Sequence, residues 1–222
     1  MIKKTLALLA LAVVTTTAQA GTSAPAPSGK GVIAPTIEPD SISYSNLSLS
    51  WQRMWAKAPV PGVGLVDLDS NGIALGLEYS PVNNLYIAAG GSWNDVELSA
   101  PGAAGNADFW TGNAGIGGYI PLTSNIHFVT ELGANYADLD GTNDWGFYVT
   151  PHVRAKFGKF ETHLGATYST NDMSINEWNA FLRLLYEVTP NVDLFVTGTV
   201  GLSDSNGIED LFGLNVGARY KF

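Results

Sequence analysis

One run of oxygen-bearing side chains has the spacing of a calcium-binding loop. Asp67, Asp69 and Asn71 alternate ahead of a glycine, and Glu78 six residues after that glycine completes the pattern. Such a loop is followed by a helix, whereas the residues leading to Glu78 alternate as a strand does and carry it away from the other oxygens. The tetrapeptide Asp-Ser-Asn-Gly recurs at 204–207, which favours a hairpin turn as the alternative. The remaining metal prediction is a Ca²⁺ site made by Asp67, Asp69 and Asn71 alone.

Histidine and glutamate side chains are the groups that could perform acid–base chemistry. Glu161 and His163 are two residues apart, while His127 and His152 have no acidic residue at that spacing. Structural ion-pair networks hold such groups as well as active sites do. We therefore predict paired, structural roles for the histidines, with no enzyme activity and no cofactor.

A period of two runs through the chain from Ile42 onward and determines how these side chains are placed. Residues 73–79, for example, alternate between large apolar residues and others, which is the periodicity of a strand and not of a helix. Ten such segments occur, most of about 9 to 12 residues, the length that a tilted strand needs to cross a bilayer. The predicted fold is all-β: a transmembrane antiparallel up-and-down β-barrel over residues 42–222. Ten strands are expected, with eight as the alternative.

The two faces of the predicted strands differ in charge. Nine of the ten apolar faces carry no Asp, Glu, Lys, Arg or His, and the first strand departs from this rule only at Arg53. The opposite faces carry equal numbers of acidic and basic residues, which suits a barrel interior because buried charges need partners. The predicted interior ionic network consists of Glu78, Glu131, Arg154, Lys156, Glu161, His163, Arg183, Glu187, Asp193, Arg219 and Lys221. The predicted opposite pairs are Lys156 with Glu161, Arg154 with His163, and Asp193 with Lys221.

Aromatic side chains on the apolar faces gather at both ends of the segments. Two such belts, about one membrane thickness apart, are expected where aromatic rings settle at the two headgroup levels. A soluble β-sandwich has no reason to place them so. The predicted belt residues are Trp51, Tyr79, Trp93, Trp110, Tyr136, Phe157, Phe160, Tyr168, Trp178, Tyr186 and Tyr220.

The connections between segments alternate between short and long. The long ones cover roughly residues 57–71, 94–108, 137–145, 169–177 and 203–210, and contain 13 acidic residues against one basic residue, Lys57. Short periplasmic turns and long extracellular loops are typical of outer-membrane barrels. The acidic loops are expected to keep the surface soluble. The alternative is a surface that bridges to lipopolysaccharide phosphates through divalent cations or meets a cationic partner.

The N-terminus has the features of a secretory signal peptide over residues 1–20. Lys3 and Lys4 precede an apolar run, and Ala18-Gln19-Ala20 forms the small-residue cleavage site. Residues 21–41 are rich in proline and are expected to form a disordered periplasmic leader. Loss of the two lysines changes the formal charge from −9 to −11, so the exported protein is acidic.

Composition excludes several classes of protein. The chain has no basic run and a net negative charge, which argues against a nucleic-acid partner. It has no cysteine, which excludes disulfide scaffolds and zinc fingers. After residue 20, no apolar stretch approaches the roughly 18 residues that a membrane helix needs.

With these features together, residues 42–222 resemble the small bacterial outer-membrane β-barrels of the porin-like, opacity-like and OmpA-barrel group. The ending with Tyr220 and Phe222 looks like the aromatic insertion signal read by the barrel assembly machinery. The resemblance implies an outer-membrane location, contact with outer-membrane lipid and lipopolysaccharide, and a monomer. Some barrels of this kind are proteases with Asp-Asp and Asp-x-His groups at the extracellular rim, whereas Glu161-Thr162-His163 adjoins a periplasmic turn.

Three functions remain open from the sequence. The first is a structural outer-membrane barrel with a charge-paired, largely filled or narrow lumen that permits limited passive diffusion. The second is a small diffusion porin for small solutes. The third is a surface adhesin or binding barrel that uses its acidic loops.

Overall fold

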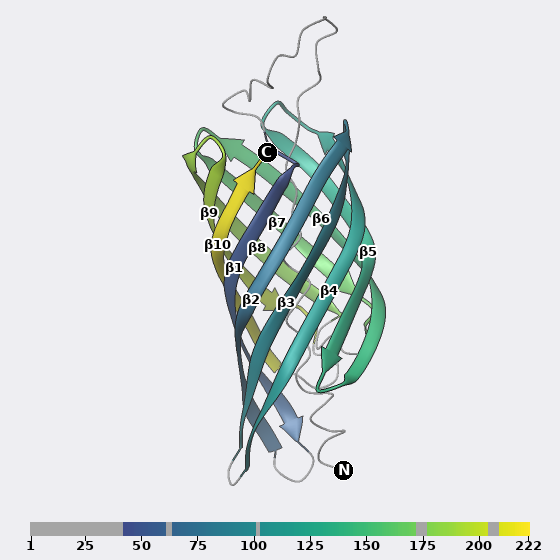
Figure 1. Ribbon diagram of the computed structural model, residues 1–222, viewed down its shortest axis with the longest axis vertical. Coiled ribbons are helices and arrows are strands. Elements are labelled where there is room, and N and C mark those ends of the chain that lie inside the picture. The colour runs from purple at the N-terminus through teal and green to yellow at the C-terminus, as the bar shows by residue number, and fades with distance from the viewer. Residues whose placement is uncertain (1–41, 61–63, 101–102, 172–176, 204–208) are drawn as a thin grey trace, which may run out of the picture.

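The computed structural model describes residues 42–60, 64–100, 103–171, 177–203 and 209–222, which form one barrel of strands (Figure 1). The expected signal peptide and leader lie outside the described residues. Within them, no helix is long and apolar enough to span a membrane. The strands are β1 (Asn46–Val60), β2 (Gly64–Val82), β3 (Leu85–Ala100), β4 (Ala103–Pro121), β5 (Ile126–Leu139), β6 (Thr142–Phe157), β7 (Phe160–Ser169), β8 (Trp178–Thr189), β9 (Val192–Gly201) and β10 (Glu209–Lys221).

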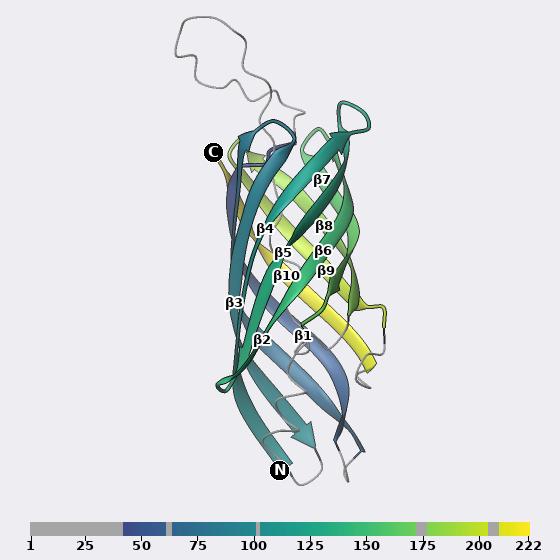
Figure 2. The ribbon, with the colours of Figure 1, turned by 90° about the vertical axis from the view of Figure 1, so that its right-hand side faces the viewer.

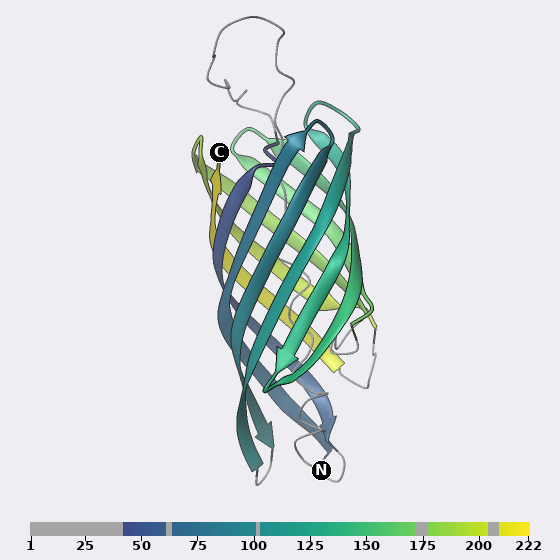
Figure 3. The same cartoon turned by 45° about the vertical axis from the view of Figure 1, so that its right-hand side comes forward.

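Each strand pairs with its neighbours in the sequence, and β1 also pairs with β10, so the sheet closes. All ten pairings are antiparallel, and the strands tilt around the barrel (Figure 3). Closure removes the sheet edges along the barrel wall, whereas in the projecting part β4 pairs with β3 alone before Phe109. The predicted all-β up-and-down barrel is confirmed with ten strands, and the eight-strand alternative is wrong.

The barrel is apolar outside and polar inside. On β2, the outward Leu75 is 52% exposed, whereas the adjacent Ala74 points inward and is 3% exposed. On β6 and β7, the inward Arg154 and His163 are fully buried. The pleat directs successive side chains to opposite faces, so this arrangement follows directly from the period of two.

The two ends of the barrel differ. We call the end with the C-terminus and the β2–β3, β4–β5, β6–β7 and β8–β9 connections the short-turn end; it is uppermost in Figure 1. The other end is the long-hairpin end, where β1–β4 project beyond the remaining strands (Figure 2). The projecting hairpins make the barrel longer on one side than on the other.

Interior side chains change in character along the barrel. The short-turn end holds the charged residues. The middle holds neutral hydroxyl and amide groups that bond to one another, such as Ser92 with Thr111 at 2.9 Å and Asn135 with Ser169 at 2.7 Å. The long-hairpin end holds an apolar layer, which the sequence analysis did not predict. Its members are Met54, Ala56, Val66, Leu68, Val96, Leu98, Ala107, Phe109, Ala137, Leu139 and Leu211.

Three of the connections expected to be long loops are strand instead. The expected loops at 57–71, 94–108 and 137–145 lie mostly within paired hairpins, and β5 and β6 are joined by Asp140 and Gly141 alone. These two residues have φ angles of 49° and 82°, as a tight hairpin turn with positive φ at both positions requires. Glycine adopts such an angle without steric cost. The expected connections near 169–177 and 203–210 do separate strands, and the 204–207 turn lies outside the described residues.

The three loops were predicted wrongly because the polar and apolar faces of the strands are exchanged in the projecting hairpins. In the projecting hairpins Asp69 and Glu97 point outward, opposite each other on β2 and β3, while Leu68 and Leu98 point inward and are buried. This is the apolar-in, polar-out pattern of a water-soluble sheet. The prediction took a strand to end where its outer face stops being apolar. In these hairpins the outer face becomes polar, although the strands remain paired.

Gly217 of β10 pairs with Ser50 of β1 at a position that has no room for a side chain. A Cβ at this position would lie 2.3 Å from the carbonyl oxygen of Leu49 and 2.8 Å from the ring of Phe195. At Gly213, on the same strand, the nearest atom would be 3.5 Å away. We expect Gly217→Ala to lower the free energy of unfolding by about 1–3 kcal/mol through overpacking, and Gly213→Ala to leave it nearly unchanged. Urea unfolding of both variants tests this, and equal losses would contradict it.

Candidate functional site

The charged side chains of the interior form the candidate site. Every residue predicted for the ionic network points into the barrel, and all are buried except Glu187, which is partly exposed. By strand, they are Glu78 on β2; Glu131 on β5; Arg154 and Lys156 on β6; Glu161 and His163 on β7; Arg183 and Glu187 on β8; Asp193 on β9; and Arg219 and Lys221 on β10.

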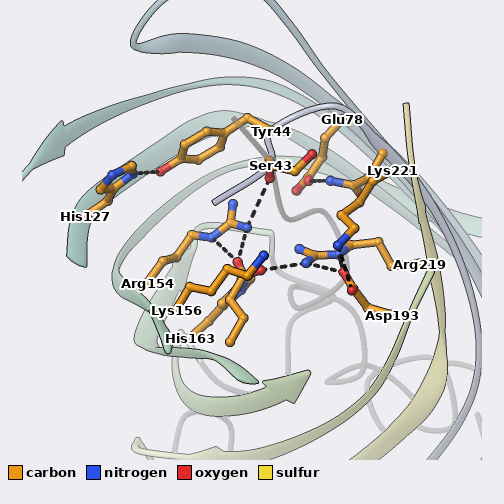
Figure 4. A network of polar contacts seen from close by, with 12 residues as sticks. Ser43, Tyr44, Glu78, His127, Arg154, Lys156, His163, Asp193, Arg219 and Lys221 are labelled. Atoms are coloured by element: carbon orange, nitrogen blue, oxygen red, sulfur yellow. Dashed lines mark hydrogen bonds and ion pairs between the residues drawn. The ribbon is translucent and has the colours of Figure 1, made fainter. Parts of the chain in front are cut away.

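Glu161 is the centre of the largest cluster. Its carboxylate accepts hydrogen bonds from Nε of Arg154 at 3.1 Å and from Nη2 of Arg219 at 2.6 Å. Nε2 of His163 lies 2.8 Å from the same carboxylate, which as an ionised group can only accept, so Nε2 is the donor. Figure 4 shows the side chains of Arg154, His163 and Arg219 gathered in the interior of the barrel. Because β7 and β10 are separated by two strands, the Arg219–Glu161 contact spans part of the interior.

A second group of charges continues from Arg219 toward the short-turn end. Nε of Arg219 donates to Asp193 at 2.7 Å, and Nζ of Lys221 donates to Asp193 and Glu187 at 2.9 Å each. Lys156 donates to the same oxygen of Glu187 at 3.0 Å. The two groups form one continuous network in which neighbouring charges alternate in sign.

Two of the three predicted opposite pairs are observed in the strand register. Lys156 does lie opposite Glu161, and Arg154 opposite His163. The ion pairs nevertheless do not follow the opposite positions. Arg154 reaches its diagonal neighbour Glu161, and Lys156 reaches past β7 to Glu187 on β8. The prediction that Asp193 lies opposite Lys221 is wrong: Asp193 faces Arg219. An Asn-Gly pair alone does not fix the length of a hairpin loop, and the observed register differs by two residues.

Three further members of the predicted set contact neutral groups or an aromatic ring. Glu78 accepts a hydrogen bond from the Asn46 amide at 2.6 Å. Glu131 accepts from the hydroxyl groups of Tyr148 at 2.6 Å and Tyr86 at 3.3 Å. The Arg183 guanidinium donates to Thr197 at 2.8 Å and lies 4.6 Å from the ring centre of Phe195. Neutral groups and an aromatic ring thus contribute to the surroundings of these three charges, in addition to the charge pairing that was predicted.

The interior also contains aromatic residues, which were not predicted from the sequence. Tyr44, Tyr86, Tyr119 and Tyr148 all lie among the charged residues, and Tyr44 contacts Arg154 and His127. Tyr86, Tyr119 and Tyr148 fall on the polar face of their strands, which was a usable signal. Tyr44 precedes Asn46, where the first strand begins, so assigning strand faces did not place it.

The predicted belt residues all lie on the outer surface. Rings from adjacent strands pack in pairs, with 5.1 Å between the ring centres of Phe160 and Tyr186 and 5.0 Å between those of Tyr168 and Trp178. Two further outward aromatics, Trp55 and Trp145, extend the belt at the long-hairpin end. They were missed because they lie at or beyond the expected strand ends. Between the belts the outer surface is apolar, as contact with hydrocarbon requires.

The comparisons with known proteins match this architecture. No protein-family model and no curated protein sequence matches the chain. Its structure is similar to the β domain of the autotransporter BrkA from Bordetella, at 8% identity and a TM-score of 0.54, over 80% of this chain and 100% of that one. It is also similar to the translocator domain of the autotransporter NalP from Neisseria meningitidis, at 11% identity and a TM-score of 0.51, over 83% of this chain and 91% of that one.

The chain has the outer-membrane β-barrel fold. At these identities the likeness concerns the fold alone, so the activities of the two autotransporters are not carried over. The predicted resemblance to outer-membrane β-barrels is confirmed by two features together, the closed ten-strand barrel and its inside-out distribution of polar residues.

The expected calcium site does not have the geometry of a loop in this outer-membrane barrel. Asp67, Asp69 and Asn71 lie on the outer face of β2, about 7 Å from one to the next as alternate strand residues are. Asp69 pairs with Arg53 at 2.6 Å, and Asn71 accepts a hydrogen bond from the indole of Trp51. Within the described residues, no cluster of three or more His, Asp or Glu has the arrangement of a metal site. The prediction of a loop at these residues is therefore wrong, because the segment is a strand, and Ca²⁺ binding by the three side chains stays a prediction.

The outward cations of the first strand also have acidic partners. Arg53 makes two hydrogen bonds to Asp69, which raise the pKa of the guanidinium above its usual value. Lys57 contacts Asp210 at 2.7 Å. Both pairs lie beyond Trp51, on the projecting part of the barrel, where solvent weakens their contribution to stability.

Proposed function

We propose that this protein is an integral outer-membrane barrel with a structural role, whose interior is closed to all but limited passive diffusion. The apolar outer band and its two aromatic belts support membrane insertion. The short-turn end would face the periplasm and the projecting hairpins the cell exterior, following removal of residues 1–20.

The observation that carries this proposal is the burial of the Glu161 network. Arg154, Glu161 and Arg219 are between 0% and 3% exposed. Charges that line a water-filled pore keep their hydration, whereas charges without water are tolerated only when each has partners. The Arg219–Glu161 contact also occupies the interior between strands that are not neighbours. A closed interior explains both features better than a wide diffusion pore does.

The same burial argues against catalysis. Glu161 and His163 are in contact, but the carboxylate is already engaged by two guanidinium groups. A substrate would have to displace those bonds within a buried network. We therefore propose a non-enzymatic role for the interior.

Conductance in planar lipid bilayers tests the proposal. We expect the purified, folded protein to give no large, stable current steps, because the charged network obstructs the passage of ions. Folding is checked by the shift in gel mobility between heated and unheated samples, and a sixteen-strand porin is the positive control for conductance. Large, stable, ion-selective steps from the folded protein would favour the small diffusion porin instead.

A further inference from the structure

Residues 42–45, which we call the strap, turn into the barrel just before the first strand begins. Asn46 starts β1 between Glu78 of β2 and Lys221 of β10. Ile42 and Tyr44 are almost completely buried, and the hydroxyl group of Tyr44 lies 3.1 Å from Nδ1 of His127 on β5. The strap therefore extends from the β1–β10 wall toward strands well removed from β1, as Figure 4 shows for Ser43 and Tyr44.

The strap is held at its inner end by side chains. The Tyr44 ring is stacked on Tyr119, with 4.0 Å between ring centres and 10° between planes, and lies 5.4 Å from the ring of Tyr86. The Arg154 guanidinium lies 4.6 Å from the centre of the Tyr44 ring. Ile42 completes an apolar cluster with Tyr86, Tyr119, Ala88 and Val129. These contacts come from β3–β6, whereas the Glu161–Glu187 network comes from β6–β10.

Arg154 contacts both groups that fill the short-turn end, the ionic network and the strap. It donates to Glu161 on one side and to the carbonyl oxygen of Ser43 at 3.4 Å on the other. The network is built from strand residues, whose positions are fixed by the ladder. The strap is not part of the sheet, and only Ser45 is bonded to the sheet backbone, at Ser80 and Phe222. The ionic network is therefore fixed in place by the strands, whereas the strap can move out without breaking a strand pairing.

We propose that the strap is a removable plug, which closes the β3–β6 side of the short-turn end by placing Tyr44 in a slot formed by Tyr86, Tyr119, His127 and Arg154. This extends the proposed closed interior by naming the part of the filling that can open. Withdrawal of the strap opens a passage beside the ionic network, while the barrel itself stays intact.

Conductance of Tyr44 variants tests the plug. We expect Tyr44→Ala to raise the conductance of the folded protein at least about twofold, because it removes the ring from a constriction. Tyr44→Phe keeps the stacked ring and should stay closed. Tyr79→Ala is the matched control, since Tyr79 lies on the lipid-facing side of β2 and is 46% exposed. Equal conductance of wild type, Tyr44→Ala and Tyr79→Ala would overturn the plug, whereas a large wild-type conductance would overturn the closed interior instead.

Thiol labelling provides a second measurement, and its first comparison does not require a Tyr44 variant to fold. The chain has no cysteine, so a single introduced thiol reports one position. Val129, beneath the strap, is fully buried, and Ser124 is exposed in the β4–β5 connection. A charged thiol reagent should modify Val129→Cys at least about tenfold more slowly than Ser124→Cys, because reaction needs access. Adding Tyr44→Ala should abolish this protection. Rapid labelling of Val129→Cys with Tyr44 intact, or protection that persists with Tyr44→Ala, would overturn the plug.

Discussion

Glu161→Gln is expected to lower the free energy of unfolding by about 3–5 kcal/mol, the usual cost of removing one partner from a buried ion pair. The substitution keeps the size of the side chain but removes the charge that Arg154, Arg219 and His163 share. Arg219 retains Asp193, whereas Arg154 loses the carboxylate that it contacts. Urea unfolding of the protein in lipid vesicles, followed by tryptophan fluorescence, measures the loss.

Asp69→Asn is the matched control for this prediction. It also removes a carboxylate from an arginine pair, but the side chains of Arg53 and Asp69 are 42% and 38% exposed. An exposed pair contributes little, so the expected loss is much smaller than that for Glu161→Gln. Combining Glu161→Gln with Arg154→Gln should restore part of the stability, because the double variant no longer buries the unpaired guanidinium. Similar losses for Glu161→Gln and Asp69→Asn would show that the network is hydrated and the interior open.

Leu164→Arg is expected to destabilise the protein in membranes by about 2–4 kcal/mol, as charges at the bilayer midplane do in such barrels. Leu164 lies on the outer face of β7, midway between the belt residues Phe160 and Tyr168, and is 60% exposed. In a water-soluble barrel, an arginine at so exposed a position would cost little. Reversible unfolding from lipid vesicles distinguishes the two cases.

Asn143→Arg is the control for Leu164→Arg. Asn143 points outward on β6, two residues beyond Trp145, and lies opposite Asp138. An added arginine at this level should change the stability by about 1 kcal/mol or less, because it lies outside the hydrocarbon. If both variants were tolerated equally, or if the folded protein stayed monomeric in water without detergent, the membrane assignment would fail.

The sequence by itself determined that there are ten strands and, over most of the barrel, which side chains point outward and which point inward. Alternation along a strand is a local property, because the pleat directs each side chain to the face opposite its neighbour whatever the strand pairs with. For this reason parity assigned Leu75 and Arg154 to faces of opposite kinds, and the absence of charge from one of these faces identified it as the outer one. The same reasoning failed in the projecting hairpins, where Asp69 and Leu68 exchange the usual roles of the two faces. Parity identifies the faces of a strand but does not say which one meets water.

Tertiary structure alone decided which charges meet and what fills the interior. Glu161 lies opposite Lys156 in the ladder, yet it bonds to Arg219, three strands along the barrel, because closure brings β7 and β10 toward one another across the interior. The placement of Tyr44 depends even more on closure, since its slot is assembled from β3, β4, β5 and β6 and exists only when the sheet is curved around it. Contacts between residues far apart in the chain depend on register, tilt and closure together, and none of these is encoded in the alternation of a single strand.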